Sequence, residues 1–235
     1  MDELATWAAT FGVVLTPGQS TQFAIYEALL VEWNERISLT AIRDPRQMRV
    51  RHFLDSLTCT AATGPLDGYS LIDIGTGAGF PGLPLKIAFP DLRLTLVDSV
   101  AKKTRFLELV VVELGLEGVT VITDRAEVLG QDVHYREAFD WATARAVAGM
   151  RVLVELLLPL VHVGGQALIQ KGGNTADEVD AAENAIFTLG GGEISLLSVD
   201  LPETDKTHLL ITIPKLRPTP AGYPRRAGIP AKRPL

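Results

Sequence analysis

The sequence predicts an α/β protein in which a doubly wound, mostly parallel sheet follows a small N-terminal helical segment. Three observations support this fold class. From residue 70 onward, strand and helix patterns alternate, which is typical of a parallel sheet covered on both faces. The first strand runs into a glycine-rich turn that opens a helix. The last two strand patterns are joined by a short link, and we expect them to pair antiparallel.

Residues 1–62 are predicted to be helical. Thr16, Pro17 and Gly18 form a helix start, and large apolar residues then recur at three- and four-residue steps. These residues are Phe23, Tyr26, Leu29, Leu30 and Trp33. A second helical candidate covers residues 47–58. The segment 63–68, TGPLDG, breaks the helical pattern and predicts a boundary between residues 62 and 63.

Residues 63–214 are predicted to form the sheet domain. Its strand candidates are Ser70–Asp73, Arg93–Asp98, Thr120–Thr123, Asp140–Ala144, Gln166–Gln170, Glu193–Val199 and His208–Ile213. Its helix candidates are Pro81–Phe89, Ala101–Leu114, Gly149–Leu160 and Thr175–Leu189. Right-handed crossovers would place a ligand beyond the carboxyl ends of the strands, at the point where the strand order reverses.

Residues 215–235 are predicted to form a basic, proline-rich tail. They carry six Lys and Arg residues and no acid, whereas residues 1–214 carry 16 basic against 28 acidic residues. The whole chain has a net charge of −6. An acidic body with a basic tail indicates either a solubilising end or a contact with nucleic acid.

The remaining composition suits a cytoplasmic protein without a metal, and we expect a monomer. The single cysteine, Cys59, excludes an intramolecular disulfide and fits a reducing compartment as a core residue. The N-terminus lacks the pattern of a signal peptide. The most apolar stretch, residues 152–163, is too short to span a bilayer. The four histidines are scattered and show no metal-ligand spacing.

The turn after the first strand, residues 73–82 with the sequence DIGTGAGFPG, predicts a ligand cradle. Gly75, Gly77 and Gly79 let the backbone turn tightly and approach a ligand without clashes from Cβ atoms. Two ligands fit the pattern. The spacing of Gly77, Gly79 and Gly82, with Asp98 about twenty residues on, matches the nicotinamide dinucleotide fingerprint.

Two features favour S-adenosylmethionine (SAM) over a dinucleotide. Asp73 ends the strand ahead of the glycines, where a carboxylate suits a cationic amino-acid group and a sulfonium but repels a pyrophosphate. Too little chain follows for the substrate domain of a dehydrogenase. A parallel sheet that ends in an antiparallel pair is also usual in SAM methyltransferases. In this interpretation Asp98 accepts hydrogen bonds from the ribose hydroxyls.

The methyl acceptor is predicted from the catalytic groups that the sequence lacks. Exocyclic amines of adenine or cytosine typically use Asn/Asp-Pro-Pro-aromatic after the fourth strand, where this chain has ARAV at 144–147. Carbon-5 of pyrimidines needs a thiolate, and Cys59 lies far from the strand ends in sequence. Guanine N7 already has a free lone pair, so its methylation needs no general base to remove a proton. A small-molecule acceptor remains open, although the basic residues argue against it.

Basic residues follow the strands and gather in two other places. Arg145 follows the fourth strand between small residues and is the candidate catalytic group, which would position the acceptor. Lys171 follows the fifth strand. The other candidates for phosphate contacts are Arg49, Arg51 and His52 in the helical segment and Arg225, Arg226, Lys232 and Arg233 in the tail.

Several motifs together resemble the bacterial 16S ribosomal RNA guanine-N7 methyltransferases of the glucose-inhibited division protein B family. They are WN at 33–34, LTAIRD at 39–44, RHFLDSL at 51–57, the glycine turn, LVDS at 96–99, RA at 145–146, KG at 171–172 and the terminal YPRRAGIPAKRPL. The resemblance implies a Rossmann-like class I methyltransferase fold and SAM as donor. It also implies N7 of a guanine in the decoding-region loop of 16S ribosomal RNA as acceptor, either in RNA or in a small-subunit assembly particle.

The same resemblance implies a set of cofactor-binding residues. They are Gly75, Phe80, Asp98, Ser99, Val100, Ala126, Glu127 and Arg145, with Asp73, Gly77 and Gly79 supporting the turn. Two functions of other classes compete with this one: an NAD(P)-dependent oxidoreductase, and a non-catalytic RNA-binding protein that keeps the fold.

Overall fold

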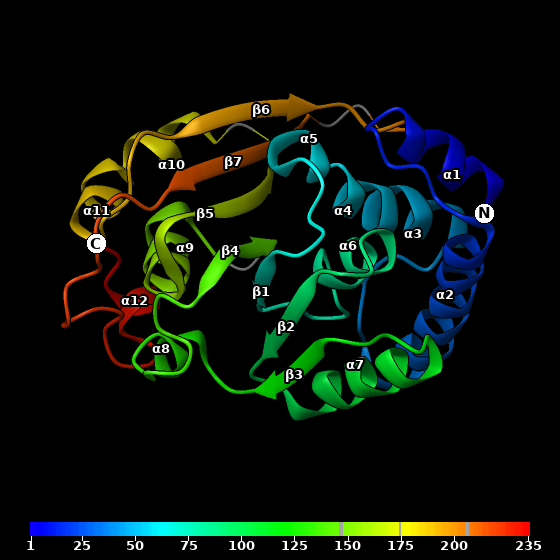
Figure 1. Cartoon of the computed structure of the whole chain (residues 1–235), viewed down its shortest axis with the longest axis horizontal. Helices are drawn as coiled ribbons and strands as arrows, with labels where there is room; N and C mark the ends of the chain where they lie inside the picture. Colours follow the sequence, from blue (N-terminus) through cyan, green and yellow to red (C-terminus); the bar gives the residue numbers. More distant parts are fainter. Residues whose placement is uncertain (146–147, 174, 205–206) are drawn as a thin grey trace.

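One seven-stranded sheet organises the chain (Figure 1). The computed structural model describes residues 1–145, 148–173, 175–204 and 207–235, so the ARAV segment after the fourth strand is described only through Arg145. The strand order is β3-β2-β1-β4-β5-β7-β6. The order reverses between β1 and β4, and the crevice at this point is where ligands bind in such sheets.

The strands confirm the predicted mixed sheet. Their bounds are β1 Ser70–Ile74, β2 Arg93–Asp98, β3 Val119–Thr123, β4 Phe139–Arg145, β5 Val161–Gly172, β6 Ser195–Val199 and β7 His208–Pro214. The pairs among β1 to β5 are parallel, and β7 is antiparallel to both β5 and β6. The first five strands therefore end at one edge, and β7 begins there.

Helices cover both faces of the sheet, as Figure 1 shows with α6 and α7 on one side and α9 on the other. After the glycine turn the helices are α6 Gly82–Ala88, α7 Ala101–Glu113, α8 Ala126–Leu129, α9 Met150–Leu157, α10 Ala176–Asp180, α11 Glu183–Thr188 and α12 Ile229–Lys232. The core divides accordingly, because side chains alternate along a strand. Leu71 joins the cluster with α6 and α7, while Ile72 joins the cluster with α9.

The helical N-terminal segment shares a core with the sheet. It comprises α1 Asp2–Ala9, α2 Pro17–Ile37, α3 Pro45–Met48, a π-helical turn Arg49–Leu54, α4 Asp55–Leu57 and α5 Thr60–Thr63. Thr16 caps α2 by accepting from the Gln19 N–H, and the Gln19 side chain accepts from the Thr16 N–H. Phe23 and Phe53 join one buried cluster with Leu83 and Phe106 across the predicted boundary. Cys59 is buried, as predicted.

Several predicted elements differ from the structure. The helix predicted over Thr175–Leu189 is two helices, α10 and α11, and the candidate over residues 47–58 is divided by the π-helical turn. The helix predicted to end at Leu160 ends at Leu157, and a 3-10 turn covers Leu158–Leu160. Pro159 explains the difference, because proline has no N–H to continue an α-helix. β5 then begins at Val161, opposite Phe139, five residues earlier than predicted. No helix among the described residues is both long and apolar enough to cross a membrane.

Candidate active site

The glycine turn is held in place by Asp73 at the end of β1. One oxygen of its carboxylate, Oδ2, accepts hydrogen bonds from the Thr76 hydroxyl at 2.7 Å and from the Gly82 N–H at 2.9 Å. Gly75, Gly77 and Gly79 have φ angles of 65°, 62° and 103°, which other residues rarely adopt. Because Asp73 occupies the first N–H of α6, that helix does not offer a bare N-terminus to a pyrophosphate. This contact argues against the dinucleotide interpretation.

Asp73 also provides a test of the fit to a cationic ligand. Its side chain is fully buried, and burial raises its pKa to about 6 against the opposing hydrogen bonds from Thr76 and Gly82. Its other oxygen, Oδ1, is buried without a hydrogen-bond partner among the described residues. A cationic group nearby would favour the ionised carboxylate. The turn therefore has the chemistry that the positively charged donor SAM requires.

Asp98, at the end of β2, faces the same turn. Its carboxylate accepts from the Gly77 N–H at 3.1 Å and from the Val100 N–H at 2.9 Å, and Lys103 Nζ lies 3.6 Å away. Ser99 and Val100 follow it directly. Each carboxylate oxygen has a second lone pair, so Asp98 fits the predicted role of accepting hydrogen bonds from ribose hydroxyls.

Replacing Asp98 with alanine is expected to weaken binding of S-adenosylhomocysteine, the demethylated product of SAM. Hydrogen bonds to a charged group contribute about 1.5–3 kcal/mol, so the dissociation constant should rise between about 10- and 150-fold. Isothermal titration calorimetry measures the change. Asp91→Ala, an exposed carboxylate that precedes the other end of β2, is the matched control and should bind like the wild type. Equal affinities of both variants would remove Asp98 from the site.

The predicted residues Ala126 and Glu127 form the opposite wall. Both lie at the start of α8, after β3, and line a cavity together with Gly75, Asp98 and Leu156 of α9. Glu127 is buried, and its Oε1 accepts a hydrogen bond from the Gly228 N–H at 2.8 Å. The C-terminal tail therefore contacts the wall of this cavity, a role that its basic composition did not indicate.

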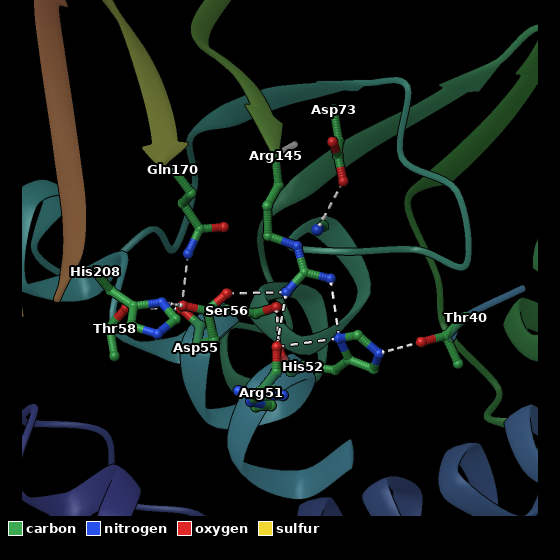
Figure 2. A network of polar contacts seen from close by, with 11 residues as sticks. Thr40, Arg51, His52, Asp55, Ser56, Thr58, Asp73, Arg145, Gln170 and His208 are labelled. Carbon is green, nitrogen blue, oxygen red and sulfur yellow. Dashed lines mark hydrogen bonds and ion pairs between the residues drawn. The ribbon is translucent and has the colours of Figure 1, made fainter. Parts of the chain in front are cut away.

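Arg145, at the end of β4, joins the glycine turn to the helical segment (Figure 2). Its guanidinium lies 4.9 Å from the centre of the Phe80 ring. Its Nη1 donates to Asp55 Oδ2 at 2.9 Å and to the Arg51 carbonyl at 3.1 Å. Its Nη2 lies 3.3 Å from His52 Nδ1. His52 Nδ1 also lies 3.0 Å from the Arg51 carbonyl, so in the neutral ring this nitrogen either accepts from Arg145 or donates to that carbonyl, and Nε2 lies 2.7 Å from the Thr40 hydroxyl.

The charges around Arg145 are fixed by burial and by this pairing. Burial, with the nearby Arg145 charge, lowers the pKa of His52 to about 4, so the ring is neutral at pH 7. Burial alone would raise the pKa of Asp55, but the hydrogen bonds and charges of His208 and Arg145 hold it below its usual value. An ionised Asp55 and a neutral His52 thus fix the orientation of one guanidinium.

Side chains of the helical N-terminal segment hold the glycine turn in place. The Tyr26 hydroxyl of α2 donates to the Ala78 carbonyl in the glycine turn, and the Tyr26 ring stacks on Phe80 with centroids 5.6 Å apart. His52 stacks on the same ring at 4.7 Å. The π-helical turn holds His52, and Asp55 follows it directly; such turns are frequent at functional sites. Neither Tyr26 nor Asp55 was predicted as a site residue.

A second, larger cavity of about 450 Å³ lies beyond the ends of β4 and β5 and the start of β7. Its lining includes Arg51, Arg145, Lys171, Gln170 and His208. Arg145 therefore lines this cavity and contacts the glycine turn through Phe80. The arrangement places this cavity beside the glycine turn. Within the described residues, no group of three or more His, Cys, Asp or Glu side chains has the arrangement of a metal site.

The residues predicted to contact RNA do not form one group. Arg49 is held by both carboxylate oxygens of Glu27, at 2.6 and 2.8 Å. Arg225 pairs with the fully buried Glu155 at 2.5 Å. His52 lies beneath Arg145, while Arg51 and Lys171 line the cavity, with Lys171 also paired to Glu178.

The tail lies folded against α8 and α9. Lys215 is fully buried and donates to the Thr219 hydroxyl at 2.5 Å, and Arg217 lies over the Phe187 ring at 4.2 Å. The exposed basic side chains of the tail beyond these pairs are Arg226, Lys232 and Arg233. At the end of the chain, Arg151 of α9 donates to the Pro234 carbonyl at 2.7 Å. Burial and internal pairing therefore reduce the basic surface that the sequence suggested.

The fold and the site together define a class I SAM-dependent methyltransferase. Two solved structures share this fold. A SAM-dependent O-methyltransferase from Thermotoga maritima aligns over 80% of this chain and 72% of its own, with a TM-score of 0.53 at 16% identity. A 16S rRNA (adenine(1408)-N(1))-methyltransferase from Catenulisporales acidiphilia aligns over 65% and 87%, with a TM-score of 0.51 at 16% identity.

Similarity in sequence identifies the family within this class. The family model described as GidB, rRNA small subunit methyltransferase G, matches residues 19–208. A relative named Ribosomal RNA small subunit methyltransferase G from Roseiflexus castenholzii is 51% identical over the full length of both chains. One of the same name from Alkaliphilus metalliredigens is 46% identical over 95% of this chain and 94% of its own. The chain belongs to the rRNA small subunit methyltransferase G family.

Proposed function

We propose that this chain transfers a methyl group from SAM to N7 of a guanine in the decoding-region loop of 16S ribosomal RNA. The observation that carries the proposal is the position of Arg145. Its guanidinium lies over Phe80 of the glycine turn and also lines the cavity at the strand ends. A SAM molecule bound at the glycine turn and a guanine bound in the cavity would meet at this residue.

When bound, SAM supplies an electrophilic methyl group on a positively charged sulfur. The chain would hold it with Asp98 at the ribose, with Ala126 and Glu127 at the adenine, and with the close backbone approach at Gly75. Guanine N7 has an unprotonated lone pair, so the protein needs to orient the base and exclude water rather than remove a proton. Positioning of this kind supplies much of the rate of a direct displacement.

The RNA backbone would contact basic residues that line the cavity at the strand ends or are exposed on the tail. Arg51 and Lys171 line the acceptor cavity, and Arg226, Lys232 and Arg233 are exposed on the tail. Arg49 and Arg225, which are held in internal ion pairs, drop out of this proposal. We expect a cytoplasmic monomer that acts on 16S ribosomal RNA or on a small-subunit assembly particle.

Chemical strand scission at N7-methylguanosine tests the function in cells. 16S ribosomal RNA from cells with the protein should be cut at one position in the decoding-region loop, and RNA from cells lacking the protein should not be cut there. Restoring the wild-type gene should restore the cut. An uncut RNA in cells with the protein would contradict the proposal, and a protein that binds SAM without producing the cut would be a non-catalytic RNA-binding protein.

A further inference from the structure

Two hydrogen-bond acceptors in the cavity beyond β5 and β7 have no donor among the described residues. The first is a ring nitrogen of His208, at the start of β7. His208 Nδ1 lies 2.9 Å from Asp55 Oδ1. Since Asp55 is ionised and can only accept, Nδ1 carries the proton, and in the neutral ring Nε2 has a free lone pair. Within the described part of the chain, no hydrogen bond to His208 Nε2 is present.

The second acceptor is the amide oxygen of Gln170, at the end of β5. The Gln170 Nε2 group donates to the Asp55 carbonyl at 2.8 Å, which fixes the orientation of the amide. Figure 2 shows its oxygen directed away from this hydrogen bond. The side chain is only 4% exposed, and Oε1 has no partner among the described residues. An unpaired buried acceptor costs about 1–3 kcal/mol, and such a group needs an explanation.

The sheet brings these two acceptors to one face. In the antiparallel pairing of β5 and β7, Gln170 lies opposite Leu210, and His208 lies two residues from Leu210 along the strand. Side chains two residues apart share a face. Gln170 Nε2 donates to the Asp55 carbonyl and His208 Nδ1 lies beside the Asp55 carboxylate, and both side chains line the 450 Å³ cavity that Arg145 also lines. The cavity therefore presents two fixed acceptors next to the proposed site of methyl transfer.

We propose that His208 Nε2 and Gln170 Oε1 accept hydrogen bonds from N1–H and the 2-amino group of the target guanine. The inference rests on the proposed function and names the residues that select the base. Guanine has both donors on its Watson–Crick edge, whereas adenine has an unprotonated N1 and no 2-amino group. Adenine would leave both acceptors unpaired, and an unpaired polar group in the site is the strongest basis for rejecting an analogue.

The same two contacts would also favour the reaction. As N7 gains a methyl group, the guanine ring becomes positively charged and its N1–H and 2-amino hydrogens become stronger donors. An acceptor that binds the charged ring more tightly than the neutral one stabilises the transition state over the substrate. Asp55, held ionised behind His208, strengthens Nε2 as an acceptor through the ring. His208 and Gln170 are thus specificity-determining residues that touch the base.

A substrate change paired with protein changes tests this assignment. 16S ribosomal RNA is assembled by ligation with either guanosine or inosine, which lacks the 2-amino group, at the target position. For the wild type, kcat/KM should fall about tenfold or more with inosine. One of the variants His208→Phe and Gln170→Leu should methylate guanosine RNA as slowly as the wild type methylates inosine RNA. That variant should show no further loss with inosine.

The controls separate this assignment from a structural effect and from the proposed function. His162→Phe removes a histidine that pairs with Asp140 at 3.0 Å at the opposite edge of the sheet, and it should keep the wild-type rate and the inosine effect. S-adenosylhomocysteine affinity should not change in any variant. If both cavity variants keep the full inosine effect, or if the wild type shows none, the assignment is wrong. If the wild type fails to methylate guanosine RNA, the proposed function itself fails.

Discussion

Replacing Arg145 with methionine is expected to lower kcat/KM for methylation of 16S ribosomal RNA by about 100-fold or more, because displacing the acceptor by about 1 Å has an effect of this size. The guanidinium contacts Asp55, His52, the Arg51 carbonyl and the Phe80 ring. Methionine keeps the apolar contact with Phe80 and removes the donors that fix the acceptor cavity. Initial rates with labelled SAM measure the loss.

Arg145→Lys is the matched variant, since it keeps the positive charge but loses the planar fork of donors. We expect it to recover only a small part of the rate. Thermal unfolding of both variants separates loss of catalysis from loss of folding, because Asp55 becomes only partly paired in Arg145→Met. The S-adenosylhomocysteine affinity should change much less than the rate. A wild-type rate in folded Arg145→Met would remove Arg145 from the mechanism.

Replacing Arg225 with methionine is expected to lower the free energy of unfolding by about 3–5 kcal/mol, the effect of leaving a buried charge without its partner. Glu155 is fully buried and accepts from the Arg225 N–H at 2.9 Å and from its Nε at 2.8 Å. Methionine keeps the backbone contact and removes the positive charge. Urea unfolding followed by circular dichroism measures the change.

The neighbouring residue is a natural control for this prediction. Arg226 is exposed, so Arg226→Met should change the stability by no more than about 0.5 kcal/mol. The double variant Glu155→Leu with Arg225→Met should recover most of the stability, because no buried charge remains. If Arg225→Met unfolds at the same urea concentration as Arg226→Met, the tail does not stabilise α9 as described.

The positions of the strands along the chain and the mostly parallel sheet were predictable because they follow from local patterns. Each parallel strand is a short apolar run bounded by turn residues, and the glycine turn after β1 has a distinctive composition. Asp98 was predictable for the same reason, since it ends a strand. The start of β5 was missed because Val161 continues the apolar run of α9, and apolar runs alone do not distinguish a buried strand from a buried helix.

The acceptor side of the site was harder to predict because its residues come from distant segments. Asp55 and His208 are 153 positions apart in the sequence, and the sequence indicated only that the histidines are scattered. They meet because β7 is inserted beside β5 and begins where the parallel strands end. The basic surface of the tail was overestimated for a related reason. The composition of the tail is basic, but the acids that pair with its basic residues, Glu137 and Glu155, lie in other elements.

The central claim is that the cradle at Gly75 and the cavity at Arg145 form one active site for guanine N7. Purified protein, 16S ribosomal RNA and SAM carrying a labelled methyl group test it most directly, with digestion of the RNA to nucleosides and chromatography. The account predicts label in 7-methylguanosine alone, approaching one methyl group per RNA and appearing about 100-fold more slowly or less with Arg145→Met. Label in any other nucleoside, or no label with a protein that binds S-adenosylhomocysteine, would contradict it.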